Sequence, residues 1–152
     1  MDTNKVSLDV TQYICVKLGS EQYGIDIQYV DNIGRMQKIT RVPKAQSYFL
    51  GVINVRGEVI PVMSMRRRMN LGNDTFTNKS RIIILKFEQD LVGVVVDEVK
   101  EVVNLREIDI EKAAHNPKDV KSSFINGVGK YDNQLISLFD IFAVIAEKEF
   151  DE

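Results

Sequence analysis

The sequence predicts a mainly β protein built from two small antiparallel barrels that pack together, with short helices and a C-terminal helix. Three observations support this fold class. Short apolar segments alternate with polar residues at a period of two, turn-forming pairs separate them, and the pattern occurs twice in the chain. With 152 residues, of which 44% are hydrophobic, the chain can bury about 70% of its unfolded surface, so its core needs no disulfide or metal.

The repeat emerges when residues 11–33 are set against residues 80–102, an offset of 69. Residues 51–65 then match residues 127–141 at an offset of 76. The seven additional residues (76 − 69) fall in the polar stretch 111–123. Two copies of one ancestral unit explain the pattern most simply, and we expect the two copies to superpose.

The repeat predicts one domain over residues 1–152 with two internal subdomains. The first subdomain covers about residues 11–72 and the second about residues 79–147, each expected to form one barrel. Between them, the polar segment 70–79 has the composition of a linker. An exchange of strands between the two subdomains is also possible.

The strands of the first copy follow in order along the chain. Residues 12–18 and 23–27 alternate in polarity and are separated by a short turn, which predicts a hairpin. Residues 52–55 and 58–63 flank Arg56-Gly57, a pair that suits a tight turn. The second copy has turn residues at the same place, so it should form the same hairpins.

Each copy ends in a short helix. Ser64 and Asp140 directly follow the last strand of their copies and can act as N-caps. The helix after Ser64 carries the run Arg66-Arg67-Arg68, which we expect to form a solvent-exposed face. The helix after Asp140 is apolar on most sides, which predicts that it is buried between other elements.

Residue counts exclude several kinds of chemistry. The chain has 20 basic and 22 acidic residues, whereas proteins that bind phosphate backbones usually have a basic excess. Its single cysteine, Cys15, and single histidine, His115, cannot form a disulfide framework or a Cys/His zinc site. Cys15 lies between apolar residues and is expected to be buried in a strand. We therefore expect no enzyme activity, no metal and no cofactor.

Targeting signals are not evident in the sequence. The N-terminal residues lack the basic and apolar regions of a signal peptide. The longest apolar run, Ile141–Ala146, is far too short to span a membrane. We expect a cytoplasmic protein that does not insert into membranes and is a monomer in solution.

Three segments together resemble the CheW family, the coupling proteins of bacterial chemotaxis. They are Gln22–Ile27, Gly51–Val62 and Val92–Val99. The pattern Gly-Val-x-Asn-x-Arg-Gly-x-x-x-Pro over Gly51–Pro61 is typical of that family and its relatives. The resemblance covers about Gln12–Ala146 and implies two five-stranded Src-homology-3-like barrels with no catalytic activity.

The resemblance also implies partners. CheW proteins link the cytoplasmic tips of methyl-accepting chemotaxis receptors to the regulatory domain of the histidine kinase CheA, so recruitment to membrane-associated receptor arrays is expected. A receptor's helical hairpin would dock between the barrels with Arg56 at this surface, and the kinase would bind near Val30. Many members carry glutamate where this chain has Asn32. The resemblance therefore does not imply a charge pair with the kinase at this position.

Matched positions of the two copies suggest which apolar residues accompany Arg56. The strand face that carries Tyr13 and Cys15 in the first copy carries Ile82 and Ile84 in the second. We interpret this face as the outside of the second barrel, which either packs against neighbouring elements or lines the receptor groove. The candidate receptor-binding residues are Arg56, Ile82, Ile84, Val92, Val99 and Val102. The candidate kinase-binding residues are Val30, Asp31 and Asn32.

A single-stranded nucleic-acid binder is the alternative function. Small barrels bind single strands with aromatic and basic side chains. Aromatic residues make up only 8% of this chain, tryptophan is absent and the net charge is −2. We therefore expect no nucleic-acid partner.

Overall fold

The structure is a computed structural model that describes residues 10–43, 45–112 and 120–146. Its strands are β1 (Val10–Leu18), β2 (Glu21–Asp26), β3 (Val30–Arg35), β4 (Phe49–Val55), β5 (Glu58–Ser64), β6 (Arg81–Phe87), β7 (Asp90–Val96), β8 (Glu98–Arg106), β9 (Ile110–Lys112), β10 (Ile125–Tyr131) and β11 (Gln134–Phe139). The helices are α2 (Met65–Arg68) and α3 (Ile141–Ile145), and the 3-10 helices are η1 (Ile27–Tyr29), η2 (Glu107–Asp109) and η3 (Val120–Phe124).

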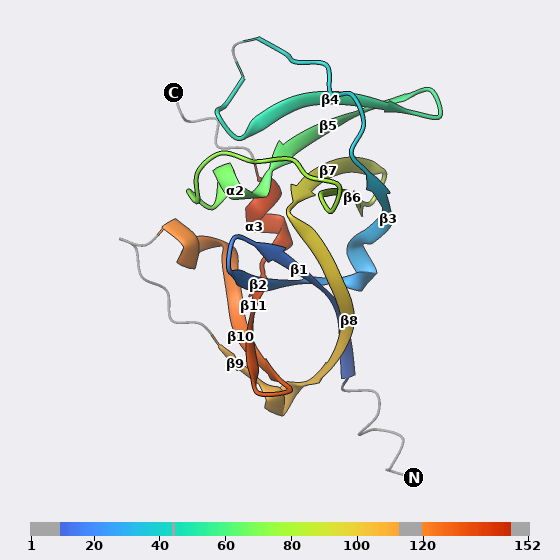
Figure 1. The fold of residues 1–152 in the computed structure, drawn as a ribbon. Coiled ribbons are helices and arrows are strands. Elements are labelled where there is room, and N and C mark those ends of the chain that lie inside the picture. The colour runs from blue at the N-terminus through green and yellow to red at the C-terminus, as the bar shows by residue number, and fades with distance from the viewer. Residues whose placement is uncertain (1–9, 44, 113–119, 147–152) are drawn as a thin grey trace.

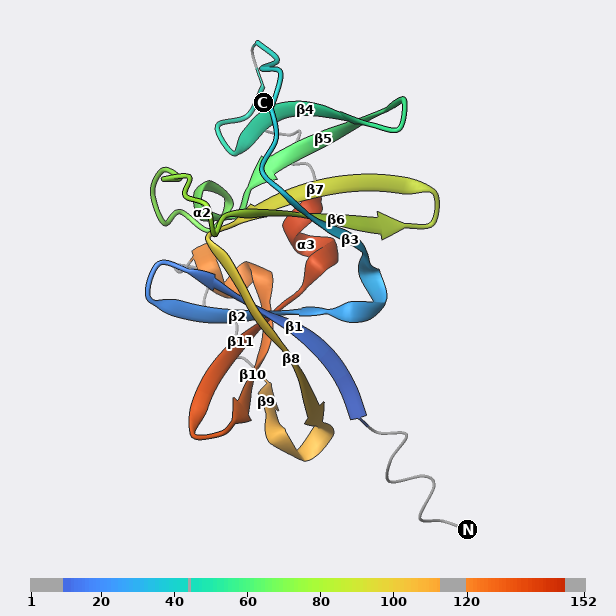
Figure 2. The same ribbon diagram turned by 45° about the vertical axis from the view of Figure 1, so that its right-hand side comes forward.

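The strands form two sheets, one above the other in Figures 1 and 2. Sheet A has the order β8-β1-β2-β11-β10-β9, and sheet B has the order β3-β6-β7-β5-β4. In sheet B, a bridge between Thr40 and Val52 connects the segment after β3 to β4, so the two end strands are joined. We call the half of the molecule that contains sheet A barrel A, and the half that contains sheet B barrel B. The mainly β fold with two packed barrels is as predicted.

Each sheet contains one parallel pair, so the sheets are mixed and not purely antiparallel as expected. The parallel pairs are β2 with β11 in sheet A and β5 with β7 in sheet B. Both pairs join a strand from one copy of the repeat to a strand from the other. The two copies meet in these parallel pairs and also in the antiparallel pairs of β1 with β8 and β3 with β6.

The two copies exchange their first hairpins. The β1–β2 hairpin lies in sheet A with β8–β11, while the β6–β7 hairpin lies in sheet B with β3–β5. The chain crosses from sheet A to sheet B at η1 and returns at Asp97, between β7 and β8. This arrangement differs from the expectation that residues 11–72 and 79–147 each form one barrel, and it corresponds to the exchange that the repeat left open.

The registers of the two sheets follow the repeat. In the parallel pair of sheet A, Gly24 lies opposite Leu138. In sheet B, Gly93 lies opposite Val62, and these residues are related to the first pair by the offsets 69 (93 − 24) and 76 (138 − 62). The structure is thus pseudo-symmetric at the level of individual strand pairs. Most of the seven-residue insertion, including His115, lies outside the described residues.

Buried apolar side chains form three clusters. The largest lies between the two sheets and contains Ile14 and Val16 of β1 together with Ile83 and Leu85 of β6. A second cluster fills barrel B and consists of Ile53, Ile60, Val62, Ile82, Ile84 and Val95. A third fills barrel A and consists of Cys15, Val103, Leu105, Ile136 and Leu138. Each central strand is therefore buried on both faces, one toward its barrel interior and one toward the other barrel.

The two expected N-caps are confirmed. The Ser64 hydroxyl accepts a hydrogen bond from the Arg67 backbone N–H, and the Asp140 carboxylate accepts one from the Ala143 N–H. Both views show α3 between the two sheets, and its Val144 is fully buried. The prediction that this helix is buried between other elements is confirmed for Ile141 and Val144, but Phe142 is exposed.

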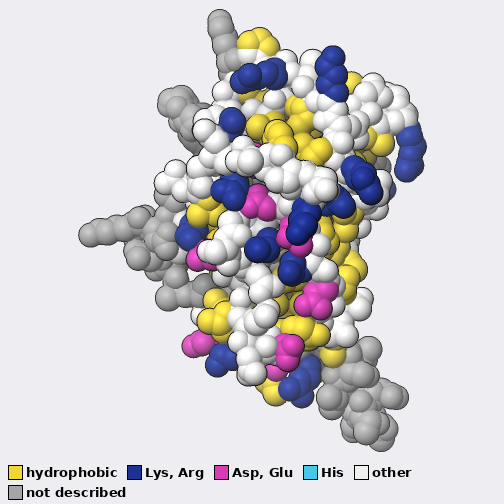
Figure 3. Space-filling view, viewed as in Figure 1, with side chains coloured by type: hydrophobic (Ala, Val, Ile, Leu, Met, Phe, Trp, Pro, Cys, Tyr) yellow, Lys and Arg dark blue, Asp and Glu magenta, His cyan; other side chains and the backbone are white. Residues whose placement is uncertain are grey.

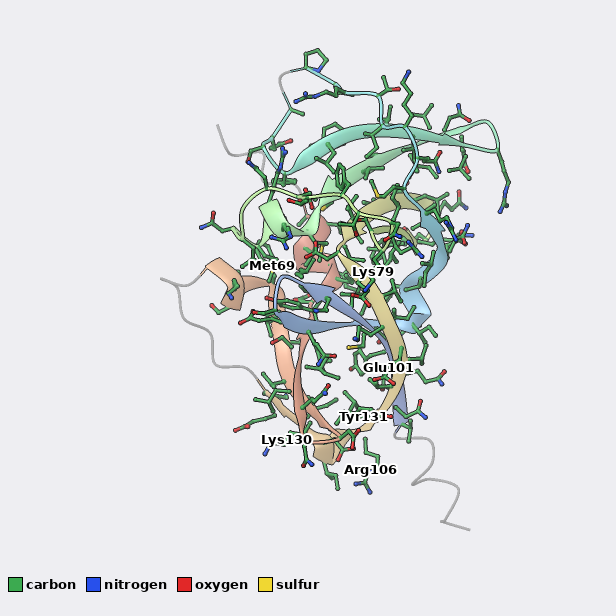
Figure 4. All side chains as sticks on the ribbon, viewed as in Figure 1. Met69, Lys79, Glu101, Arg106, Lys130 and Tyr131 are labelled. Carbon is green, nitrogen blue, oxygen red and sulfur yellow. The ribbon has the colours of Figure 1, made fainter. Side chains whose placement is uncertain are left out.

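The expected solvent-exposed arginine face is wrong. Arg68 is only 7% exposed, donates from Nε to the Val144 carbonyl at 2.7 Å and lies over the Tyr48 ring. The last carbonyl groups of a helix lack partners within it, and a guanidinium supplies donors for them. Met69, labelled in Figure 4 where α2 approaches sheet A, is also completely buried. The region after Ser64 therefore anchors α3.

Candidate functional site

Arg56 lies at the tip of the β4–β5 hairpin. Arg56 and Gly57 both have positive φ values, 53° and 82°, which is the conformation of a tight type I′ turn. The Asn54 side chain accepts a hydrogen bond from the Gly57 N–H at 3.1 Å. The Asn-x-Arg-Gly sequence therefore fixes the turn, and the exposed Arg56 side chain is left available for contact.

A hollow of about 430 Å³ lies beside this turn at one end of barrel B. Its wall includes Arg56 and also Asp31 and Asn32 of β3, with Ile84 contributing. The structure thus brings together residues that the sequence assigned to two different partners. Val30 is instead half-buried against the cluster between the sheets.

A second depression of about 510 Å³ continues from this hollow toward α3. The two share four residues, which are Glu58, Ile60, Gln89 and Leu91. A third depression of about 550 Å³ adjoins the second through Pro61, Val92 and Ile145. We call the surface formed by the lining residues Val59, Pro61, Phe87, Val92 and Ile145, together with Phe142, whose ring packs on Phe87, the junction groove. It runs from the Arg56 hairpin to the helix between the barrels.

Three aromatic side chains form one end of the junction groove. The centroid of the Tyr29 ring lies 5.5 Å from that of Phe87 and 5.2 Å from that of Phe142. The centroids of the Phe87 and Phe142 rings are 5.1 Å apart. They come from η1, β6 and α3, so the exchange of hairpins and the docking of α3 together create the cluster. Phe142 is 55% exposed. A large ring left this open in a packed aromatic cluster marks a surface suited to a partner.

The candidate receptor-binding residues do not all lie on one surface. Ile82 and Ile84 are 2% and 5% exposed and belong to the interior of barrel B, so the interpretation of their strand face as an outer face is wrong. The face opposite, with Ile83, packs on barrel A. Val92 lines the junction groove, and Val99 is half-buried against the central cluster.

Val102 is 48% exposed on β8, at the end of sheet A, and its counterpart Ile33 on β3 is 38% exposed. Sequence reasoning missed Ile33, as it missed Val59 and Phe142. Val59 could have been found, because it lies on the outward side of a hairpin next to Arg56. Phe142 lies on a helix that is apolar on most sides, so the sequence did not indicate which side of the helix would be exposed.

An ion pair links the two barrels. Arg66 donates from Nη2 to Asp97 at 2.6 Å and from Nε to the same carboxylate at 2.9 Å. Asp97 also accepts from the Gly19 N–H at 2.8 Å, so the pair ties α2 of barrel B to the β1–β2 turn of barrel A. Burial opposes ionisation of Asp97, but the hydrogen bonds from Arg66 and Gly19 outweigh it and lower its pKa below the ordinary value.

Cys15 is no candidate nucleophile. It is completely buried, and burial together with the nearby Glu101 charge raises its pKa to about 11, which leaves the thiol protonated. Among the described residues, no group of His, Cys, Asp and Glu side chains could hold a metal ion. None of the helices seen there is long and apolar enough to cross a membrane.

Comparison with known proteins agrees with this geometry. A family model described as a CheW-like domain matches residues 12–149. The chain belongs to the CheW family. The chemotaxis protein CheW of Bacillus subtilis (strain 168) is 36% identical over 132 residues, which cover 87% of this chain and 85% of the relative. CheW of Thermotoga maritima is 29% identical over 147 residues, which cover 97% and 95%.

A solved structure is similar throughout. The crystal structure of the scaffolding protein TtCheW from Thermoanaerobacter tengcongensis matches with a TM-score of 0.79 and 30% sequence identity, and the match covers 88% of this chain and 86% of that chain. The Src-homology-3-like description of the barrels is consistent with this match. CheW proteins form a non-catalytic scaffold family, and this member is not an enzyme.

Proposed function

We propose that this CheW-family scaffold couples methyl-accepting chemotaxis receptors to the histidine kinase CheA in membrane-associated arrays. The relatives with similar sequences are chemotaxis proteins. The observation that carries the proposal is the continuity of the Arg56 hollow with the junction groove. One elongated partner can therefore contact a positive charge and a row of apolar side chains at the same time.

A receptor tip has the shape that this surface requires. A helix laid in a groove buries apolar side chains spaced along one face. Val59 and Val92 offer such contacts along the junction groove, and the exposed Phe142 adds one beside Phe87. Arg56 at the end of the groove would fix the direction of the helix by pairing with an acidic group.

The kinase contact is proposed on β3. Asp31 and Asn32 are exposed on this strand, which is an end strand of sheet B. They line the same hollow as Arg56, so kinase and receptor would bind next to each other. Ile33, exposed on the same strand, would supply apolar contact area.

The test uses the repeat as its own control. Val59 and Leu135 occupy matched positions (135 − 76) and are 65% and 63% exposed, so replacing either one by aspartate should leave the fold intact. We expect Val59→Asp and Arg56→Glu each to weaken binding of a receptor-tip fragment at least tenfold in calorimetry. Leu135→Asp, on barrel A, should bind normally.

Equal affinity of Val59→Asp and Leu135→Asp for the receptor tip would exclude the junction groove as the receptor site. The kinase contact is tested separately with the CheA regulatory domain. Asp31→Lys should weaken that complex while receptor-tip affinity changes less than threefold. Loss of both affinities in this variant would mean that one surface serves both partners.

A further inference from the structure

The third depression, which adjoins the second through Ile145, has an apolar wall. Its lining includes Tyr48, Phe49, Pro61, Met63, Val92 and Ile145. All of these except Met63 are half-buried, so the wall is open to an incoming side chain. None of the described residues that line it is charged. A hollow of about 550 Å³ can take one aromatic ring, the kind of side chain that buries the most apolar surface.

The chain leaves α3 at this wall. Ile145 lines the depression, and the following residue, Ala146, has an extended backbone with φ −65° and ψ 131°. The Ala146 carbonyl accepts a hydrogen bond from Nη2 of Arg68 at 2.5 Å, which fixes the exit point. Residues 147–152, which lie outside the described part of the chain, therefore start beside the third depression.

These six residues combine one aromatic side chain with a strong negative charge. Their sequence is Glu-Lys-Glu-Phe-Asp-Glu, with one basic and four acidic residues, so the net charge is −3 (1 − 4). Phe150 comes four residues after Ala146, and four extended residues span at most about 14 Å. Phe150 is therefore within reach of a depression whose wall includes Ile145.

Charge distinguishes the two depressions that Ile145 borders. The second depression has Glu58 and Asp90 in its wall and no basic residue among the described ones, so it repels an acidic segment. The third adjoins a depression of about 450 Å³ whose wall includes Arg41 and Arg67. Figure 3 shows apolar side chains with Lys and Arg around them in the upper part of the molecule, where β4 lies in Figure 1.

One positive charge at this end is not matched by an acidic residue in the described part of the chain. Arg41 is exposed and forms no ion pair there. Asp74 lines a pocket together with Arg41 and Arg67, while Asp97 is paired with Arg66. A single carboxylate thus lies beside two guanidinium groups, which favours an anionic segment at this end.

We propose that residues 147–152 fold back onto their own chain, with the Phe150 ring in the third depression and the neighbouring acidic residues beside Arg41 and Arg67. The apolar wall stabilises the contact by removing the ring from water, and the arginines set the direction of the segment. A short tether gives an effective concentration on the order of 1 mM, so even a contact with a dissociation constant of about 1 mM is half occupied. A segment of another protein would lack this advantage.

The docked segment would cover part of the junction groove. Pro61, Val92 and Ile145 belong both to the third depression and to the junction groove. A receptor helix would have to displace the segment, which makes it an autoinhibitory contact. This consequence rests on the proposed receptor surface, whereas the docking itself does not.

The docking is tested by attaching a nitroxide label to the ¹⁵N-labelled variant Glu152→Cys. Cys15 is buried and protonated, so the label reacts with the new cysteine alone. We expect the amide signals of Gln46 and Phe49, in the third depression, to lose at least threefold more intensity than that of Gln89, in the second. Equal losses in the two depressions would overturn the proposal.

Further variants of the labelled chain separate docking from mere proximity to α3. Phe150→Ser should abolish the difference between the two depressions, whereas the control Lys148→Ser, in the same segment, should keep it. Arg41→Glu should reduce the difference, and Asp151→Lys added to Arg41→Glu should partly restore it. An unchanged pattern of signal loss in Phe150→Ser would contradict the proposal.

A mixed sample shows whose segment is bound. The nitroxide-labelled chain without ¹⁵N is mixed with a ¹⁵N-labelled chain that carries no nitroxide. We expect no selective loss of the Gln46 and Phe49 signals in this mixture. A selective loss would place the segment on a neighbouring copy and overturn the contact within one chain.

Receptor binding is measured separately by calorimetry with a receptor-tip fragment. If the contact is half occupied, its removal in Phe150→Ser should strengthen receptor binding about twofold, whereas Lys148→Ser should bind as the unaltered chain does. Unchanged receptor affinity in Phe150→Ser, together with the expected nitroxide effect, would support the docking and exclude its overlap with the receptor surface.

Discussion

The two barrels fill the same interior space with different residues. Ile84 in barrel B and Cys15 in barrel A occupy one position of the repeat (84 − 69), and both are buried. On the paired strand, barrel A has the buried Val103, whereas its counterpart in barrel B is the half-buried Gly34, where a Cβ would meet no heavy atom within 4 Å. Barrel A therefore fills a position that barrel B leaves open, and the two interiors are not packed in the same way.

This difference explains why the more apolar strand in the second copy was misread. Ile82 and Ile84 looked like surplus apolar surface when they were compared only with Tyr13 and Cys15. They are instead buried in the interior of barrel B. A difference between two copies of a repeat indicates exposure only when all positions that face the same interior are compared.

The strongest test of this comparison removes the large side chain from barrel B and the small one from barrel A. Ile84→Ala leaves a cavity in the barrel B cluster and should destabilise the protein by about 3–4 kcal/mol. Cys15→Ala removes only one sulfur atom and should cost about 1 kcal/mol. Urea unfolding measures both values. Equal losses would show that the two interiors are not packed as described.

A second test concerns the matched glycines Gly51 and Gly127 (127 − 76). Gly51 has a φ of 143°, and a Cβ there would collide with the Thr40 carbonyl. At Gly127 the nearest atom, the Glu111 carbonyl oxygen, would be 2.8 Å away and φ is not positive. We expect Gly51→Ala to destabilise by about 3 kcal/mol and Gly127→Ala by about 1–2 kcal/mol in thermal unfolding. The reverse order would contradict the close approach of Thr40 to β4 at the bridge with Val52.

A third test addresses the contact that ties the barrels together. Asp97 has a lowered pKa in the folded state, so its contribution is complete above the unfolded value of about 4 and is lost as the pH falls through the folded pKa. Arg66→Ala should cost about 1–3 kcal/mol at pH 7. The loss of stability in this variant should shrink as the pH falls below about 4 in acid titrations of stability. A deficit that is constant with pH would show that Arg66 acts by packing alone.

The smallest expected effect is a gain in stability. A Cβ at Gly34 would meet no heavy atom within 4 Å, and its φ is not positive. Gly34→Ala should therefore stabilise barrel B by about 0.4–1 kcal/mol, because it restricts the unfolded chain. Differential scanning calorimetry would detect the rise in melting temperature. A loss of stability would mean that barrel B has no spare room at this position.

Much of the fold could be predicted from the sequence because local signals determine it. The hairpins, the turn at Arg56 and the caps at Ser64 and Asp140 follow from residue types at fixed spacings. Which hairpin enters which barrel could not be predicted, because exchanged and unexchanged copies bury the same residues in the same registers. Both faces of β6 are apolar, so the sequence pattern could not show which face points into barrel B and which face packs against barrel A.

The candidate site was predicted where a residue lies at a turn tip and missed where it depends on tertiary contacts. Arg56 and Asp31 were named from the chain itself and the family resemblance, and both line one hollow, while their binding roles stay predictions. The cluster of Tyr29, Phe87 and Phe142 joins three distant segments and has no local pattern. The role of Arg68 was missed for the same reason, because its partners belong to α3.

The exchange of hairpins also determines when the chain can fold during synthesis. Ile14 of β1 pairs with Val102 of β8, which leaves the ribosome 88 residues later (102 − 14). Until then, β1 and β2 have no sheet to join, and β3 waits likewise for β6. Such long-range pairing slows folding and leaves strand edges open. Chaperone protection is thus needed most while only the N-terminal half of the chain has been synthesised.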